Sequence, residues 1–388
     1  METISNELKK IKESGLYRKL NILEGAQGPH VKIKGRTYIS FCSNNYLGLA
    51  NHPEVVKAVK DAVGKYGWGA GASRLVSGNT ELHQALEDEI SKFKRKEAAI
   101  VFPTGYMANI GTICSLVSSG DLVICDKLNH ASIIDGCRLS GATFRVYPHR
   151  DVGKLENILK NSKGYPRKLI VTDTVFSMDG DLVPLPDIVR IAHEYNAMVM
   201  VDEAHGTGVF GENGRGVVEH FNLDKKINII MGTLSKAVGS LGGFVTGNSD
   251  LISYLRNKAR TFMYTTALPP AACAASIAGI KLIQRDHSLR ESLWRNVHYV
   301  KERLKLLNLN VTSLESPIIP IIIGNAKKAV DISGFLFESG ILIPAIRPPT
   351  VPDESSRLRV TIMATHTRAD LDRLLDVLKS SQICITES

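Results

Sequence analysis

Between residues 98 and 247, short apolar runs alternate with stretches whose apolar positions recur at helical spacing. The runs are almost continuous in apolar residues, as in strands that are buried on both faces. Strands are expected at 98–102, 122–125, 168–172, 197–201 and 227–231, and helices at 106–116, 131–139 and 187–195. This alternation predicts an α/β architecture, with a large, mostly parallel sheet covered by helices on both faces.

Beyond Pro270 the pattern changes to longer helical stretches separated by single strands. Residues 271–307 read as a long helix or two in succession, followed by strands at 318–323 and 357–363 and helices at 326–338 and 369–378. Before residue 45, a helix precedes a short hairpin with strands at 31–33 and 38–40. We therefore expect an N-terminal segment (1–44), a large α/β domain (45–280) and a smaller α+β C-terminal domain (281–388).

The composition is that of an ordinary globular protein, with 44% hydrophobic and 22% charged residues in a chain of 388. No membrane span is expected, because the weakly polar stretch 267–280 is too short and contains Pro269-Pro270. Residues 1–19 lack the apolar core of a signal peptide. Six cysteines are scattered without a C-x-x-C pair: Cys42, Cys114, Cys125, Cys137, Cys273 and Cys384. Neither disulfides nor a metal site is expected, and a reducing cytoplasm is the predicted location.

The net charge of +9 suggests anionic ligands or partners. Phosphorylated cofactors, thioesters or an acidic carrier protein would each explain it. The densest basic run, 92–96, ends an acidic helix and is typical of a solvated helix face, so no nucleic-acid partner is expected.

Several strings imitate functional motifs. Residues 206–211 fit G-x-G-x-x-G, but a loop follows where a dinucleotide site needs a helix. Residues 202–205 spell a helicase box, yet the chain has no phosphate loop, no zinc-protease helix and no G-x-S-x-G elbow. These comparisons exclude four common enzyme classes.

Polar residues that could act together follow the predicted strands. Asp202 and His205 come after 197–201, Gly105 opens a helix suited to a phosphate, and Lys236 follows 227–231 among apolar neighbours that would lower its pKa. Taken singly, each has a plainer interpretation: a loop or helix cap, or a solvated lysine. Their convergence favours chemistry, since seven such residues follow five strands at one edge: Gly105, His130, Ser177, Asp202, His205, Thr233 and Lys236.

The motifs together resemble the α-oxoamine synthase family of pyridoxal-phosphate (PLP) enzymes, which have the aspartate-aminotransferase fold. The resemblance covers nearly the whole chain and rests on SNNYLGL (43–49), ASRLVSG (72–78), LNHASIIDG (128–136), VFSMDGD (175–181), VDEAHG (201–206) and GTLSK (232–236). Within the family, LYR (16–18), GTLSK and AIRPPTVP (345–352) are most similar to the member that acts in biotin synthesis.

The resemblance implies a role for each residue around the cofactor. Lys236 would hold PLP covalently and serve as base and acid at the substrate α-carbon. Asp202 would pair with the pyridine nitrogen, His205 with the ring hydroxyl, and His130 would stack on the ring. Four further residues would surround the ring and phosphate: Gly105, Tyr106, Ser177 and Thr233. Thr266 would reach the phosphate of a neighbouring subunit, which implies a homodimer.

For the substrates, the resemblance implies that Arg359 clamps the amino-acid carboxylate and that Arg18 and Thr350 contact the acyl group. The implied reaction is the decarboxylative condensation of L-alanine with a pimeloyl thioester. Arg18 could instead be an ordinary exposed residue, and the acyl carrier could be coenzyme A or acyl carrier protein.

Three alternatives remain at this point. Within the family, a glycine-using 2-amino-3-ketobutyrate ligase would take acetyl-CoA. An aminotransferase usually stacks an aromatic residue where this chain has His130. A non-catalytic binding protein would have little reason to keep Lys236, Asp202 and His205 together.

Overall fold

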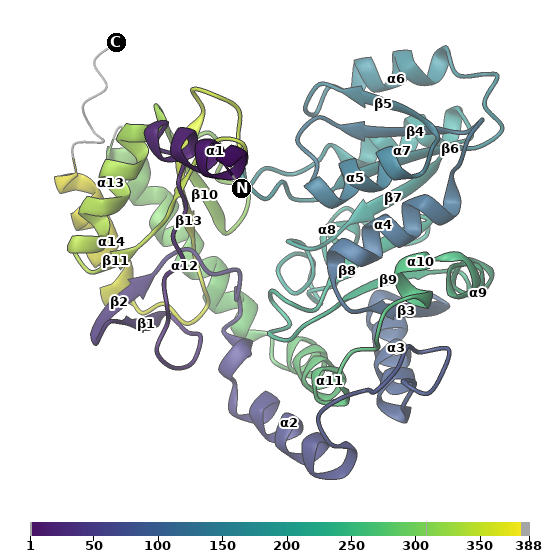
Figure 1. Ribbon diagram of the computed structural model, residues 1–388, viewed down its shortest axis with the longest axis horizontal. Helices are drawn as coiled ribbons and strands as arrows, with labels where there is room; N and C mark the ends of the chain where they lie inside the picture. Colours follow the sequence, from purple (N-terminus) through teal and green to yellow (C-terminus); the bar gives the residue numbers. More distant parts are fainter. Residues whose placement is uncertain (1, 308, 382–388) are drawn as a thin grey trace. The chain divides into compact units, whose positions relative to one another are not determined.

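The computed structural model describes residues 2–307 and 309–381, and the chain divides into two compact units (Figure 1). The sheet unit comprises residues 49–177 and 182–290. The terminal unit comprises the described parts of 1–48, 178–181 and 291–388. The expected boundaries at 44/45 and 280/281 thus fall within ten residues of 48/49 and 290/291, and residues 1–44 share a unit with the C-terminal part.

The sheet unit contains a seven-stranded sheet in the order β3-β9-β8-β7-β6-β4-β5. Its strands are β3 (Ala98–Phe102), β4 (Leu122–Asp126), β5 (Thr143–Tyr147), β6 (Lys168–Asp173), β7 (Met198–Asp202), β8 (Ile229–Thr233) and β9 (Gly243–Gly247). Neighbours from β5 to β8 pair in parallel, whereas β9 is antiparallel to both β8 and β3. The predicted, mostly parallel sheet is confirmed. The pattern analysis missed β5 and the antiparallel β9.

Helices cover both faces of this sheet. On one face, α4 (Gly105–Leu116), α5 (Ala131–Leu139), α9 (Ser249–Lys258) and α10 (Arg260–Met263) contribute buried side chains to one apolar cluster with the sheet. Helices α3 (Glu81–Lys94), α6 (Val152–Lys160) and α7 (Leu185–Glu194) contact strands but contribute nothing to that cluster, so they cover the other face. The unit also contains η1 (Leu49–Asn51), α2 (Pro53–Tyr66), the four-residue α8 (Val217–His220) and α11 (Pro270–Arg285).

The strand directions decide where the polar residues gather. Strands β3 and β8 run the same way, because both are antiparallel to β9, and β4, β6 and β7 run parallel to β8. All five therefore end at the same edge of the sheet, here called the carboxyl edge. The expectation that residues after these strands share one edge is confirmed.

The terminal unit contains two three-stranded sheets, β1-β2-β11 and β10-β13-β12. Strand β2 pairs antiparallel with β1 and parallel with β11, and this second pairing joins the N-terminal hairpin to the C-terminal part of the chain. Its strands are β1 (His30–Ile33), β2 (Arg36–Ser40), β10 (Ile318–Gly324), β11 (Ile341–Leu342), β12 (Ala345–Ile346) and β13 (Ser356–Thr361). Its helices are α1 (Glu2–Glu13), α12 (Ser288–Leu304), η2 (Lys305–Leu307), α13 (Ala326–Glu338) and α14 (Arg368–Ser380).

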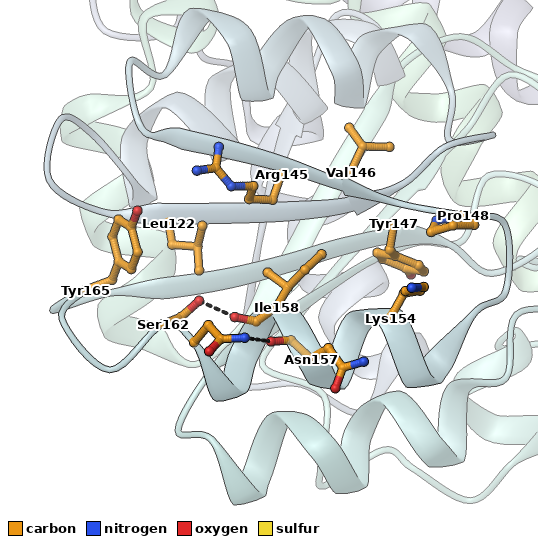
Figure 2. A pocket seen from close by; sticks show the side chains of 11 residues that line it. Leu122, Arg145, Val146, Tyr147, Pro148, Lys154, Asn157, Ile158, Ser162 and Tyr165 are labelled. Carbon is orange, nitrogen blue, oxygen red and sulfur yellow. Dashed lines mark hydrogen bonds between the residues drawn. The ribbon is translucent and has the colours of Figure 1, made fainter.

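A cavity of about 450 Å³ lies beside β5 and α6, at the end of the sheet's strand order (Figure 2). Arg145, Tyr147 and Lys154 are among its lining residues, and none of the predicted site residues lines it. Among the described residues, no helix has both the length and the apolar character to cross a membrane. Five cysteines are free thiols, and Cys384 lies outside the described residues.

Candidate active site

Asp202 is the last residue of β7, at the carboxyl edge, and its side chain is buried. Both carboxylate oxygens have fixed donors, because Oδ1 accepts from the Ala204 backbone N–H (2.8 Å) and Oδ2 from Asn109 Nδ2 (2.8 Å). On the neighbouring strand, Asp173 lies opposite Asp202 in the register. Burial, followed by the nearby charge of Asp202, raises the pKa of Asp173 well above its usual range. The carboxyl edge therefore holds one carboxylate fixed in orientation and a second that resists ionisation.

Lys236 lies in the connection between β8 and β9, which is held closed by short-range hydrogen bonds. The Thr233 hydroxyl donates to Gly242 O (2.9 Å) and accepts from the Ser235 N–H (3.2 Å). Gly239 has a φ of +76°, and a Cβ there would come within 2.5 Å of the backbone of the chain at residues 49–50. Glycine is required at this turn, which places the half-buried Lys236 at the carboxyl edge beside Thr233.

The N-terminus of α4 lies at the same edge. Thr104 caps the helix by accepting from the Met107 N–H (3.1 Å). A Cβ on Gly105 would come within 2.9 Å of the Met231 methyl group and 3.6 Å of Thr233 Oγ1, so the start of this helix packs closely against the end of β8. The first turn of a twelve-residue helix is a favourable place for a phosphate.

His130 is the N-cap residue of α5, and its ring is exposed. Its backbone N–H donates to Asp173 Oδ2 (2.7 Å), and the Tyr106 ring meets its ring edge-on with centroids 6.3 Å apart. Although His130 is exposed to solvent, the protein atoms around its imidazole partly desolvate it and so lower its pKa, while the charge of Asp202 raises the pKa and that of Lys236 lowers it further. His130, Asp202 and Lys236 are therefore close enough to act on one another electrostatically.

Four other predicted site residues belong to the sheet unit. His205 is buried in the turns that follow β7, and Ser177 is half-buried after β6. Tyr106 is exposed and donates its hydroxyl to Asp135. Thr266 is exposed beyond α10, in a segment tied to residues 72–78 by the hydrogen bond from Ala267 N to Ala72 O (3.0 Å).

The glycine string at 206–211 has a structural explanation. A Cβ on Gly206 would lie 2.0 Å from Glu203 Oε2, and one on Gly211 would lie 2.2 Å from Glu219 Oε2. These glycines make room for buried carboxylates rather than for a dinucleotide phosphate. Turns follow Gly206, and no long helix starts there, as the sequence predicts.

The predicted substrate residues belong to the terminal unit. Arg359, on β13, is buried and donates to Asn44 Oδ1 (3.0 Å) and Thr361 Oγ1 (3.1 Å). Beside it, burial raises the pKa of Tyr46 to about 12, although the Arg359 charge opposes the rise. A guanidinium can bind a carboxylate through two parallel hydrogen bonds.

Arg18 and Thr350 lie in two segments that are fastened to each other. Arg18 Nη2 donates to Pro348 O (3.1 Å), and Arg347 Nη2 donates back to Tyr17 O (2.7 Å). Thr350 closes a turn by donating its N–H to Arg347 O (3.1 Å). The charge of Arg18 contributes, after burial, to a lowered pKa of Arg347. The two guanidinium groups therefore concentrate positive charge beside Thr350.

Residues 36–378 match the family model "Aminotransferase class I and II". The chain belongs to this family. Curated relatives include an 8-amino-7-oxononanoate synthase from Thermoanaerobacter pseudethanolicus, 48% identical over 376 residues (97% of this chain, 95% of the relative). Another, from Citrifermentans bemidjiense, carries the same name and is 48% identical over 381 residues (98% of each).

Solved structures of the family superimpose closely on this chain. A serine palmitoyltransferase from S. paucimobilis, solved with PLP and myriocin bound, matches with a TM-score of 0.93 and 34% identity (97% of this chain, 96% of that one). An 8-amino-7-oxononanoate synthase from Francisella tularensis matches with a TM-score of 0.77 and 32% identity (88% and 97%). The predicted aspartate-aminotransferase-like fold is confirmed.

The donor set at the carboxyl edge fits PLP. It combines a buried carboxylate, a lysine amine, imidazoles and hydroxyl groups with a helix N-terminus made accessible by Gly105. Sequence reasoning missed two buried residues of the site, Asn109 and Ser132. Asn109 could have been noticed, because it is a polar residue in the otherwise apolar helix that Gly105 opens.

Proposed function

We propose that the protein condenses L-alanine with a pimeloyl thioester and releases carbon dioxide, giving 8-amino-7-oxononanoate for biotin synthesis. The observation that carries the proposal is the grouping of Lys236, Asp202 and His130 at one sheet edge. The names of relatives that are 48% identical over almost the whole chain support the same reaction. The family match supports PLP as the cofactor.

When bound, PLP supplies an electron sink for the negative charge that develops at the amino-acid α-carbon. In the proposed site, Lys236 would hold the cofactor covalently and would move the proton at that carbon. Asp202, fixed by Asn109 and Ala204, would keep the ring nitrogen protonated. His205 would bind the ring hydroxyl, and His130 would lie on the ring face and orient the acyl donor.

The phosphate would be held at the N-terminus of α4. Gly105 and Tyr106 begin this helix, and Ser177 and Thr233 follow neighbouring strands at the same edge. Backbone N–H groups and the helix dipole favour a negative group there. These four residues are the proposed phosphate and ring contacts.

Arg359 is proposed to bind the carboxylate of the amino acid. Arg18 and Thr350, with Arg347 beside them, are proposed to bind the polar far end of the pimeloyl chain, which an acetyl donor lacks. The net charge of +9 suits either coenzyme A phosphates or an acidic acyl carrier protein as the carrier.

We further propose a homodimer in which Thr266 reaches the partner's cofactor phosphate. Exposed apolar side chains lie on the segments that flank it: Leu75, Val76 and Tyr264 are 52%, 80% and 70% exposed. Such a patch is typical of an interface. Sedimentation of wild type and Val76→Asp tests this, with a dimer and a monomer expected. The free thiols accord with a proposed cytoplasmic location.

The deciding experiment compares L-alanine and glycine, each with pimeloyl and acetyl thioesters. The pair of L-alanine and pimeloyl thioester should have the highest kcat/KM. Discrimination between the acyl donors should be strong, because a site built on hydrogen bonds rejects a donor lacking the partner group. One methyl group is worth only about 1–3 kcal/mol, so alanine and glycine should differ less. A preference for glycine with acetyl-CoA would establish the 2-amino-3-ketobutyrate ligase alternative instead.

A further inference from the structure

A chain of hydrogen bonds runs from Asp202 to His130 through two residues to which no role has been assigned. Asn109 Nδ2 lies 2.8 Å from both Asp202 Oδ2 and Ser132 Oγ. Ser132 Oγ lies 2.7 Å from His130 Nδ1, and the Ser132 backbone N–H also donates to that nitrogen (3.3 Å). Asn109 and Ser132 are 1% and 0% exposed, so water does not compete for these bonds.

The chemistry of the groups fixes the direction of each bond. A carboxylate accepts, so the amide nitrogen of Asn109 must face Asp202, and its second hydrogen goes to the Ser132 oxygen. The Ser132 backbone N–H can only donate, so its bond to His130 Nδ1 requires that this nitrogen carry no proton. The Ser132 hydroxyl then donates its own hydrogen to the same nitrogen.

The amide of Asn109 is retained at a cost to stability. Its Oδ1 is buried and has no hydrogen-bond partner among the described residues. An unsatisfied buried oxygen is unfavourable, so what the amide contributes here is its two hydrogens, which bind Asp202 and Ser132. Asn109 therefore contributes to this position through the two hydrogen-bond donors of its amide rather than through its packing.

We infer that Asn109 and Ser132 are positioning residues that fix Asp202 in orientation and hold His130 as the neutral tautomer protonated on Nε2. The inference rests on the proposed function for the roles of Asp202 and His130. It assigns His130 Nε2–H as a hydrogen-bond donor to the substrates and excludes Nδ1 as a base. Other groups also act on His130: Asp135, Asp173 and Lys236 by charge or hydrogen bond, and Tyr106 by ring contact.

Two charge-neutral variants test this chain of hydrogen bonds without altering these other groups. Ser132→Ala removes the hydroxyl that stabilises unprotonated Nδ1, and Asn109→Leu lets that hydroxyl turn away. Nitrogen-15 NMR of histidine-labelled, cofactor-free protein reports the tautomer and pKa of His130, whose signal a His130→Gln spectrum identifies. Wild type should show the Nε2–H form. The pKa of His130 should rise by about 0.5–1 unit in Ser132→Ala and by less in Asn109→Leu, since one hydrogen bond contributes about 0.5–1.5 kcal/mol.

Thr112→Val is the matched control, because Thr112 is buried three residues further along α4 and its hydroxyl has no partner among the described residues. It should leave the His130 pKa unchanged. An Nδ1–H tautomer in wild type, or an unchanged His130 pKa in folded Ser132→Ala and Asn109→Leu, would overturn the inference that Asn109 and Ser132 position His130. Neither readout needs cofactor or substrate. Failure of the proposed function would appear separately, as absence of product from L-alanine and pimeloyl thioester.

Discussion

Asp202 and Glu203 are adjacent at the end of β7, but their carboxylates lie in different surroundings. Asp202 faces α4 and joins the polar group at the carboxyl edge. Glu203 is fully buried and accepts from the backbone N–H groups of Val217 (3.0 Å) and Val218 (2.8 Å). Its charge is balanced by the buried Lys94 of α3, whose helix covers the other face of the sheet.

The two regions each contain a lysine, and burial strongly lowers the pKa of Lys94, which is not the one proposed to react. Burial lowers the pKa of Lys94 to about 8, against the attraction of Glu203 and Glu219. Its ammonium group donates to Thr207 Oγ1 (2.8 Å) and to Arg215 O, so fixed acceptors enclose it. Lys236 is half-buried at an edge where a ligand can reach it. A shifted pKa marks burial, and only accessibility together with converging groups marks a reactive site.

The largest expected effect is that of Lys236→Ala, which distinguishes Lys236 from Lys94 by their reactivity toward the cofactor. Lys236→Ala should lose covalently held cofactor, seen as loss of its absorbance, and essentially all turnover. Borohydride reduction of the wild-type holoenzyme followed by peptide mapping should label the peptide that contains Lys236. Label on Lys94 would break the comparison, because it would show that the buried amine is the reactive one.

Lys94→Met should act on stability instead. Removing the buried ammonium group leaves its acceptors, Thr207 Oγ1 and Arg215 O, without their donor and takes away a positive charge that acts on Glu203, which costs about 1–3 kcal/mol of unfolding free energy. Urea denaturation measures the loss, and borohydride should still label Lys236 in the folded fraction. Lys92→Met, at an exposed position on the same helix, is the control and should stay within about 0.5 kcal/mol of wild type. Equal stability of the two variants would contradict the structural role of Lys94.

Asp202→Asn tests the neighbouring carboxylate. An amide cannot keep the ring nitrogen protonated, so kcat should fall about 10²–10³-fold while the protein folds and binds cofactor. Steady-state kinetics with L-alanine and pimeloyl thioester measure the fall, and circular dichroism checks the fold. Turnover close to wild type would show that another group performs this task.

Arg18→Ala should affect only the long acyl donor. Loss of a hydrogen bond to a charged partner predicts a fall of about 10-fold or more in kcat/KM with pimeloyl thioester. Cofactor absorbance should remain that of wild type. Lys19→Ala, an adjacent exposed cation, is the control for a general charge effect. An equal fall in the two variants would assign the effect to net charge rather than to Arg18.

The last expected effect is a difference in pH dependence. The folded pKa of Lys94, about 8, lies below its unfolded value, so the unfolded chain binds more protons between about pH 8 and 10.5. Stability should therefore rise with pH across this interval, by at most about 1.4 kcal/mol per pH unit for one proton. The difference between wild type and Lys94→Met in urea denaturation isolates this contribution. A wild-type stability that falls relative to the variant from pH 8 to 10 would refute the lowered pKa.

The sequence itself determined most of the sheet and the membership of the carboxyl edge. The continuous apolar runs predicted β3, β4, β6, β7 and β8 to within two residues, because strands covered on both faces leave an unmistakable pattern. Parallel strands end at one edge of a sheet. The residues at the ends of these strands, Lys236 and Asp202 among them, therefore lie together at the carboxyl edge. Strand β5 was missed because it is the outermost strand of the sheet. Its middle residues are exposed there, which weakens the apolar pattern.

Only the tertiary structure decided how the gathered residues are held. Asn109, Ser132 and Asp202 are distant in sequence, and their hydrogen bonds depend on α4 and α5 packing side by side over the sheet. The same holds for Lys94 and Glu203, whose electrostatic interaction depends on α3 covering the opposite face. Periodicity along a chain reports which face of an element is buried, but the partner of a buried polar group is chosen by the packing of several elements at once.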